Sequence, residues 1–336
     1  MKKLILGVMS FLLLSVGATV CLAGSSVDKA FNDNIREGDG KLIIGNSNGK
    51  IDASSGFIDD THTINKYGRA ESGVETTATD IWDQAEGTPT NQVWDAPTAA
   101  RVHSIVSSSA SDASAGVGAR TLRLWGLQDW DTQEVSEDII MNGTGTVNTT
   151  RSYVIIHRMK VLTKGATNVN VGSITATAAS DATITAEIKA GIGQTEMAIY
   201  GISSLEDMFV SGYYGSINKA QGTAATINYS LLVNPEPDSE LINFNRKNTI
   251  GVQSTGASHF SHPFNPYLCV PGPAIVKVSG LASIGDVDGS AGFDGYIKVK
   301  PTSFDDFVVL KTSTTRHNTA KILQIHDGSL LRLTGQ

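Results

Sequence analysis

The chain has 336 residues, enough for one large β domain or two smaller ones with a substantial core. Hydrophobic residues make up 40% and charged residues only 18%, and the chain has 34 glycines. This composition favours many short strands and turns over charged amphipathic helices. The formal net charge of −7 gives no general electrostatic reason to bind nucleic acid or an anionic membrane.

The first 23 residues have the pattern of an export signal. Lys2 and Lys3 precede a long apolar run, and the small residue Ala23 stands just before Gly24. The pattern predicts cleavage at that point and export. A retained membrane anchor and a hydrophobic arm that imitates a signal are the alternatives. Cleavage would leave Cys269 as the single cysteine, so we expect no intramolecular disulfide in the mature chain.

Residues 24–95 are polar and irregular, and we predict that they form an extended arm. Apolar residues are too sparse there to build an independent core. Ile81, Trp82 and Trp94 are the expected anchors of the arm. Two interpretations stay open, because such aromatic residues dock an arm onto its own domain or contact another subunit.

From residue 96 onward the hydrophobic pattern repeats every second residue, as in β-strands. About a dozen short strand-like runs, separated by Gly, Pro and Asn turns, predict an all-β fold of the antiparallel sandwich or jelly-roll type. The division is either two tandem units, 96–204 and 205–300, or one large unit. Residues 301–336 form a C-terminal extension, in which 307–311 and 321–325 are apolar enough to pair with a neighbouring strand.

Chemistry-bearing patterns in the sequence are weak. His259 and His262 are three residues apart, but no acid or thiol stands at a spacing that would complete a metal site. Asp286 and Asp288 flank a tight turn and lack the further oxygen ligands of a calcium loop. His157 lies on an apolar strand face, as a hydrogen-bonded core histidine would. We predict no catalytic, cofactor-binding or metal-binding residue, and therefore no enzyme.

The segment 127–138, LQDWDTQEVSED, is acidic and is bordered by aromatic residues. Trp125 and Trp130, with Asp131 and Glu134 nearby, could form a surface on which a sugar ring stacks. The alternative is that both tryptophans pack into the core or onto a neighbouring subunit. This is the one region where the sequence predicts a ligand site.

A series of motifs follows a fixed order between Ile64 and Val299. They are INKYGR (64–69), DIWD (80–83), the stretch IVSSSASDASAGVGARTLRLWGLQDWDTQEVSEDIIMNG (105–143), GQTEMAIYGI (193–202), GYYGSINKAQGTAA (212–225), GASHFSHPFNPYL (256–268) and VDGSAGFDGYIKV (287–299). As an ordered set they resemble a group of structural proteins encoded by tailed bacteriophages. Each motif alone is of low complexity.

The resemblance implies a non-enzymatic virion component, such as a capsid decoration, a head or tail accessory protein or a fibre-type protein. It implies partners that are copies of the chain itself or capsid and tail proteins, and a location in the virion. The signal-like N-terminus departs from such proteins, which are assembled in the cytoplasm. It favours the alternative of an exported bacterial adhesin or glycan-binding β module, periplasmic or extracellular, with no membrane attachment after cleavage.

Overall fold

The computed structural model describes residues 60–85, 92–219, 224–239, 243–254, 258–300 and four residues near the C-terminus. The regular structure of the described residues is antiparallel strands, with one short 3-10 helix, η1 (Asp83–Ala85). The all-β prediction is therefore confirmed. Within the described part no helix has the length and apolar character needed to cross a membrane. The predicted leader, 1–23, lies outside the described residues.

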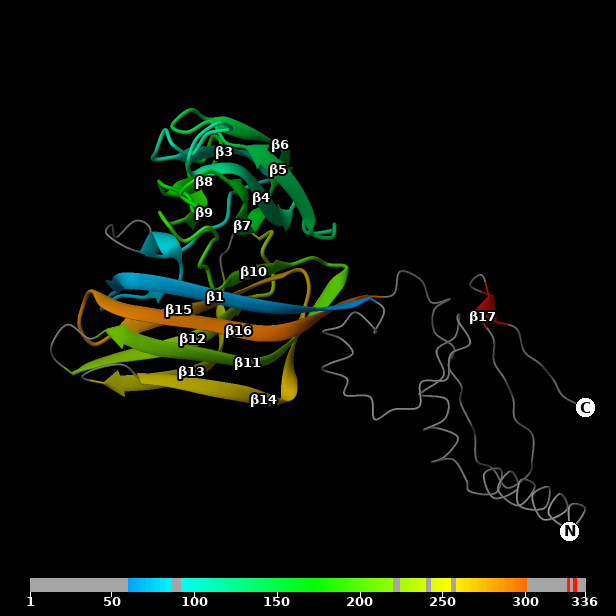
Figure 1. Cartoon of the computed structure of the whole chain (residues 1–336). Coiled ribbons are helices and arrows are strands. Elements are labelled where there is room, and N and C mark those ends of the chain that lie inside the picture. Colours follow the sequence, from blue (N-terminus) through cyan, green and yellow to red (C-terminus); the bar gives the residue numbers. More distant parts are fainter. Residues whose placement is uncertain are drawn as a thin grey trace, which may run out of the picture. The chain divides into compact units, whose positions relative to one another are not determined.

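Two sheets in the middle of the chain pack as the small sandwich (Figure 1). Its first sheet has the order β6-β3-β8-β9 and its second has the order β5-β4-β7. The strands are β3 (Arg101–Ser107), β4 (Ala119–Leu127), β5 (Val135–Ile140), β6 (Val147–Tyr153), β7 (Ile155–Lys164), β8 (Ile174–Ala178) and β9 (Ile184–Ile188). Leu122 and Leu124 of β4 and Met159 of β7 are fully buried between these sheets, as their alternation predicts.

Two further sheets pack as the large sandwich (Figure 1). One has the order β1-β16-β11-β14, and the other has the order β10-β15-β12-β13 with β2 added on β15. Their strands are β1 (Thr61–Val74), β2 (Thr79–Asp80), β10 (Ile199–Ile202), β11 (Glu206–Lys219), β12 (Ala225–Asn234), β13 (Asn245–Ser254), β14 (Ser258–Pro271), β15 (Ala274–Ala282) and β16 (Val287–Val299). Tyr229 of β12 crosses the interior and donates a hydrogen bond to the Ser216 carbonyl oxygen of β11 at 2.6 Å.

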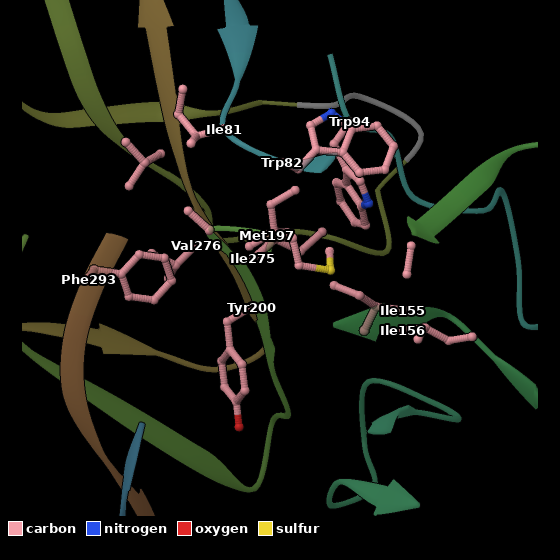
Figure 2. Close-up of a cluster of buried hydrophobic side chains, with 14 of the residues drawn as sticks. Ile81, Trp82, Trp94, Ile155, Ile156, Met197, Tyr200, Ile275, Val276 and Phe293 are labelled. Atoms are coloured by element: carbon pink, nitrogen blue, oxygen red, sulfur yellow. The ribbon is translucent and has the colours of Figure 1, made fainter. Parts of the chain in front are cut away.

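One hydrophobic core is shared by both sandwiches. Figure 2 shows the part where they meet, with Ile155 and Ile156 of β7 close to Met197 and to Ile275 of β15. The described residues of the two sandwiches accordingly belong to one compact unit. The Lys66 ammonium of β1 also donates a hydrogen bond to the His157 carbonyl oxygen of β7.

The structure corrects the predicted arm over its described portion, 60–85. β1 is a fourteen-residue strand that pairs with β16 from Thr61 to Val74, and β2 pairs with β15. β1 was not predictable from the sequence, because two inward positions of the strand are Lys66 and Gly68, which interrupt the apolar alternation. Residues 24–59 lie outside the described residues.

The sequence division at residue 204 also differs from the sheets. β10 precedes that point, yet it pairs with β15 of the large sandwich. Because β1 and β2 come from the N-terminal side, the large sandwich encloses the small one in the chain. In the C-terminal extension the structure describes only the two-residue strands β17 (Ile325–His326) and β18 (Ser329–Leu330), and these pair with each other. The segment 307–311 is outside the described residues.

Candidate functional site

Trp82 and Trp94, the predicted anchors of the arm, are buried in the core. Each has only 2% of its surface exposed, and both lie in the cluster of Figure 2. The Trp94 indole N–H donates to the Thr185 carbonyl oxygen at 2.9 Å, which ties it to the small sandwich. Both residues therefore dock the chain onto itself, which is the first of the two interpretations that the sequence leaves open.

Trp130 and Asp131 do not form a ligand surface. Trp130 is buried, and its carbonyl oxygen accepts a hydrogen bond from the Ser204 N–H at 2.6 Å. Asp131 is exposed in a turn, where its N–H donates to the Asp129 carboxylate at 2.9 Å. Trp130 therefore packs into the core, as the alternative interpretation states. A substitution of Trp130 would test folding rather than binding.

Trp125 is different, because it lines a groove between the edge of β1 and the β4–β7 surface. The groove has a volume of about 460 Å³. β1 contributes the run from His62 to Tyr67, and Glu134 lies just before β5. The other lining residues are Trp125 (β4), His157 and Arg158 (β7), Gln194 and Thr195 (the loop before β10) and Tyr200 (β10).

Arg158 stacks on the indole of Trp125. Its guanidinium carbon lies 4.8 Å from the ring centroid, within the range of a cation–π contact. The two residues are partners in the β4–β7 register, which fixes them side by side. Arg123, on the same face, is 6.0 Å from the same ring and forms two hydrogen bonds with Asp138. Trp125 is thus held as a rigid, partly exposed aromatic surface.

A partly buried hydrogen bond joins His157 and Glu134 behind this surface. The His157 Nε2 atom lies 2.5 Å from a Glu134 carboxylate oxygen. Burial disfavours the charged form of both groups. The pKa of His157 is lowered, whereas the hydrogen bond and nearby cations outweigh burial at Glu134 and lower its pKa as well. A neutral imidazole therefore donates to a carboxylate, and the His157 Nδ1 has no partner among the described residues.

Lys66 brings a buried amine to the groove, and it is only partly protonated at neutral pH. Burial, followed by the positive charge of Arg158, lowers the pKa of its ammonium to about 7. Desolvation also raises the pKa of the Tyr200 phenol well above its usual value, so this group is a neutral hydroxyl. The groove therefore combines an aromatic face, the Arg158 guanidinium, the Lys66 amine, a carboxylate and several hydroxyl and amide groups.

Sequence reasoning located Trp125 and Glu134 but missed Lys66, Arg158 and Tyr200. Its prediction that His157 is a hydrogen-bonded core histidine is confirmed, and the same residue also lines the groove. The alternation in 153–161 was a usable signal for Arg158, since it points away from the buried face of β7. The approach of β1 was not predictable, because residues 60–85 did not read as a strand.

Two residues of the weak metal-binding patterns, His262 and Asp288, form hydrogen bonds with other side chains. The Asn248 side-chain amide donates a hydrogen bond to the His262 Nε2 atom at 2.9 Å, and Arg69 donates two hydrogen bonds to the Asp288 carboxylate. Within the described ranges no group of three or more potential metal ligands occurs.

Comparisons with known proteins give only distant likenesses. No protein-family model and no curated protein matches the sequence. Among solved structures, the tandem CBM22-1–CBM22-2 domain of Paenibacillus barcinonensis Xyn10C is 8% identical, with 70% of this chain and 94% of that one covered and a TM-score of 0.21. The infectious bursal disease virus Gx strain structure is 8% identical, covering 73% and 72%, with a TM-score of 0.20.

The T=1 particles derived from the same virus are 11% identical, covering 72% of this chain and 69% of that one, with a TM-score of 0.21. TM-scores this low support no assignment of family or function.

Proposed function

We propose that this chain is a non-enzymatic structural protein of the virion type, which assembles through the edges of its sheets. The ordered motifs between Ile64 and Val299 supply the resemblance to tailed-phage structural proteins. The observation that carries the proposal is the paired edge made by β13 and β14. Each is the last strand of its sheet in the large sandwich, and the two lie side by side (Figure 1).

β13 is the better of the two strands for pairing with another chain. β14 contains Pro263 and Pro266, which lack the N–H groups that a strand ladder needs. β13 runs for ten residues without proline, and its only strand partner among the described residues is β12. An edge strand with free backbone groups can accept an added strand. We propose that a C-terminal segment of a second copy supplies it.

The virion assignment is tested on particles of the phage or prophage that encodes the chain. Particles purified on a density gradient are analysed by mass spectrometry, and antibody raised against residues 24–336 is used for immunogold labelling. The proposal expects the chain to co-purify with particles and the antibody to label one defined part of them. A chain found only in the soluble or secreted fraction, with unlabelled particles, contradicts it.

A second candidate function, glycan binding, is favoured by the groove at Trp125. A rigid tryptophan face beside carboxylate, amide and hydroxyl groups matches the apolar face and polar rim of a sugar ring. Such a function is compatible with a fibre-type protein and with an exported adhesin.

This candidate is tested on a glycan array with the wild-type chain, Trp125→Ala and Trp125→Phe. We expect the Ala variant to lose binding and the Phe variant to keep part of it, because a smaller aromatic face remains. Ile140→Ala on β5 is the control, since Ile140 is also exposed but lies outside the groove. Glycan binding by Trp125→Ala at the wild-type level would contradict glycan binding at this groove.

A further inference from the structure

β7 carries a row of cations on its outer face. Its inward residues, among them His157 and Met159, are buried, whereas Arg158, Lys160 and Lys164 are exposed. Side chains two residues apart on a strand stand on one face, roughly 7 Å apart. The three cations therefore lie on one face of β7, with the exposed Leu162 between Lys160 and Lys164, and we call them the β7 stripe.

The β7 stripe connects two cavities. Arg158 lines the groove at Trp125, and a second cavity of about 190 Å³ is lined by Lys160, Lys164, Asn168 and Ile192, among others. Gln194 lines both cavities, so they are neighbours along one surface.

A loop fixes the wall that the two cavities share. The Val161 N–H donates to the Gly193 carbonyl oxygen at 2.8 Å, and the Thr195 N–H donates to the Met159 carbonyl oxygen at 3.0 Å. These bonds hold the loop along the edge of β7. Gly193 has a φ of +78°, a backbone conformation that glycine adopts without strain. The wall shared by the two cavities is therefore fixed by backbone hydrogen bonds as well as by side chains.

The positive charge of the stripe is not neutralised by neighbours. Lys160 and Lys164 form no ion pair within the part of the chain that the structure describes, whereas Arg123 on the adjacent strand is paired with Asp138. The chain as a whole carries a net charge of −7. A cationic line on an acidic protein creates a local potential that attracts an anionic ligand.

We propose that the β7 stripe binds a linear acidic polysaccharide, with one sugar ring on Trp125 and successive carboxylates along Arg158, Lys160 and Lys164. The inference rests on glycan binding at the groove and names the class of glycan. The two cavities hold rings at each end of the stripe, and the loop 191–195 borders the chain of sugars.

A polysaccharide fits this surface better than a nucleic acid does. Glu134 is ionised at the inner end of the groove, where it accepts hydrogen bonds from the hydroxyl groups of a sugar ring. Gln194 and Thr195 add neutral groups that bond to hydroxyls. Nucleic-acid binding draws its affinity from neutralising many phosphates, and a single row of three cations on an acidic chain supplies little of that.

The test measures calorimetric binding of uronate and sialate oligomers, their methyl esters and the matching neutral oligomers at low and high salt. We expect the carboxylated oligomers to bind about ten-fold more tightly than their esters, a difference of about 1.4 kcal/mol. Raising the salt concentration should reduce that preference. Lys160→Gln/Lys164→Gln should remove the preference and leave weaker, salt-independent binding. Arg151→Gln/Lys298→Gln, which removes the same charge elsewhere on the exposed surface, should change nothing.

Equal affinity for the carboxylated oligomers and their methyl esters would contradict the proposal that the β7 stripe binds carboxylates, but it would leave glycan binding at the groove intact. No binding of any oligomer, acidic or neutral, would overturn both. Single-stranded DNA that binds more tightly than every uronate, and loses that binding in Lys160→Gln/Lys164→Gln, would assign the stripe to nucleic acid instead.

Discussion

Asp83 shows how burial decides the state of a single side chain. It follows β2 in η1, and one carboxylate oxygen accepts a hydrogen bond from the Glu196 N–H at 2.7 Å. The other oxygen has no partner among the described residues. Desolvation raises the pKa of Asp83 to about 8. The negative charges of Glu196 and Glu187 act in the same direction, whereas the hydrogen bond opposes the shift. The folded chain therefore holds a proton there at neutral pH.

This predicts a pH-dependent stability that Asp83→Asn removes. A carboxyl whose pKa is raised by folding adds stability below its unfolded pKa, near 4, and that stability is lost as the pH rises to about 8. The free energy of unfolding of the wild type, minus that of Asp83→Asn, should fall across this window by up to about 1.4 kcal/mol per pH unit. Urea denaturation of both proteins from pH 4 to pH 8 measures it. Parallel curves would show that Asp83 is ionised in the fold.

Lys277 and Asp80 form a buried ion pair beside Trp94. The Lys277 ammonium lies 2.6 Å from an Asp80 carboxylate oxygen, and that oxygen also accepts the Trp94 N–H at 2.8 Å. Removing the cation leaves a carboxylate in the core without its counter-charge. We expect Lys277→Met to lower the free energy of unfolding by about 3–5 kcal/mol.

The double variant Asp80→Asn/Lys277→Met is the matched control for this pair. It keeps an acceptor for the Trp94 N–H and removes both charges, so it should regain most of the lost stability. If the double variant is as unstable as Lys277→Met, packing rather than charge accounts for the loss. Chemical denaturation at one pH is sufficient for both variants.

Among the elements, β1 carries the largest difference between sequence and structure. β7 was predictable, because the alternation in 153–161 separates its buried face from Arg158 and Lys160. β1 was not, because Lys66 occupies a buried position and Gly68 has no side chain to show which way it faces. The Trp125 groove lies between these two strands. The side of the groove that carries Trp125 was therefore predictable from the sequence. The side formed by β1 was not, because it depends on long-range packing.

Gly68 allows β1 to approach the core closely. A Cβ atom there would lie 2.2 Å from the Ile81 carbonyl oxygen and 2.5 Å from the Ala198 nitrogen, both of which are backbone atoms. These two atoms are joined by a hydrogen bond of 2.9 Å. We expect Gly68→Ala to force β1 outward and to lower the free energy of unfolding by about 1–3 kcal/mol.

Gly251→Ala on β13 is the control for this effect. The added Cβ would meet only the Asn228 side-chain amide at 2.8 Å, and that side chain can rotate away. Thermal unfolding of the two variants compares them directly. Equal melting temperatures for Gly68→Ala and the wild type would show that β1 does not lie against Ile81 and Ala198.

At the scale of the whole molecule, two sandwiches share one core and leave the β13–β14 edge without a further strand among the described residues. The sequence predicted the all-β class from its alternation and turns. It could not predict that the small sandwich is inserted into the large one, because the pairing of β1 with β16 joins segments more than two hundred residues apart. Such long-range pairing leaves no local signal in the sequence.

Assembly through the sheet edge is tested most directly by the mass of the chain in solution. Sedimentation velocity is measured over a range of concentrations for residues 24–336 and for residues 24–300, which keep all the strands of both sandwiches. The account predicts that 24–336 forms a discrete oligomer and that 24–300 sediments as a monomer. A chain of residues 24–336 that stays monomeric at every concentration would contradict it.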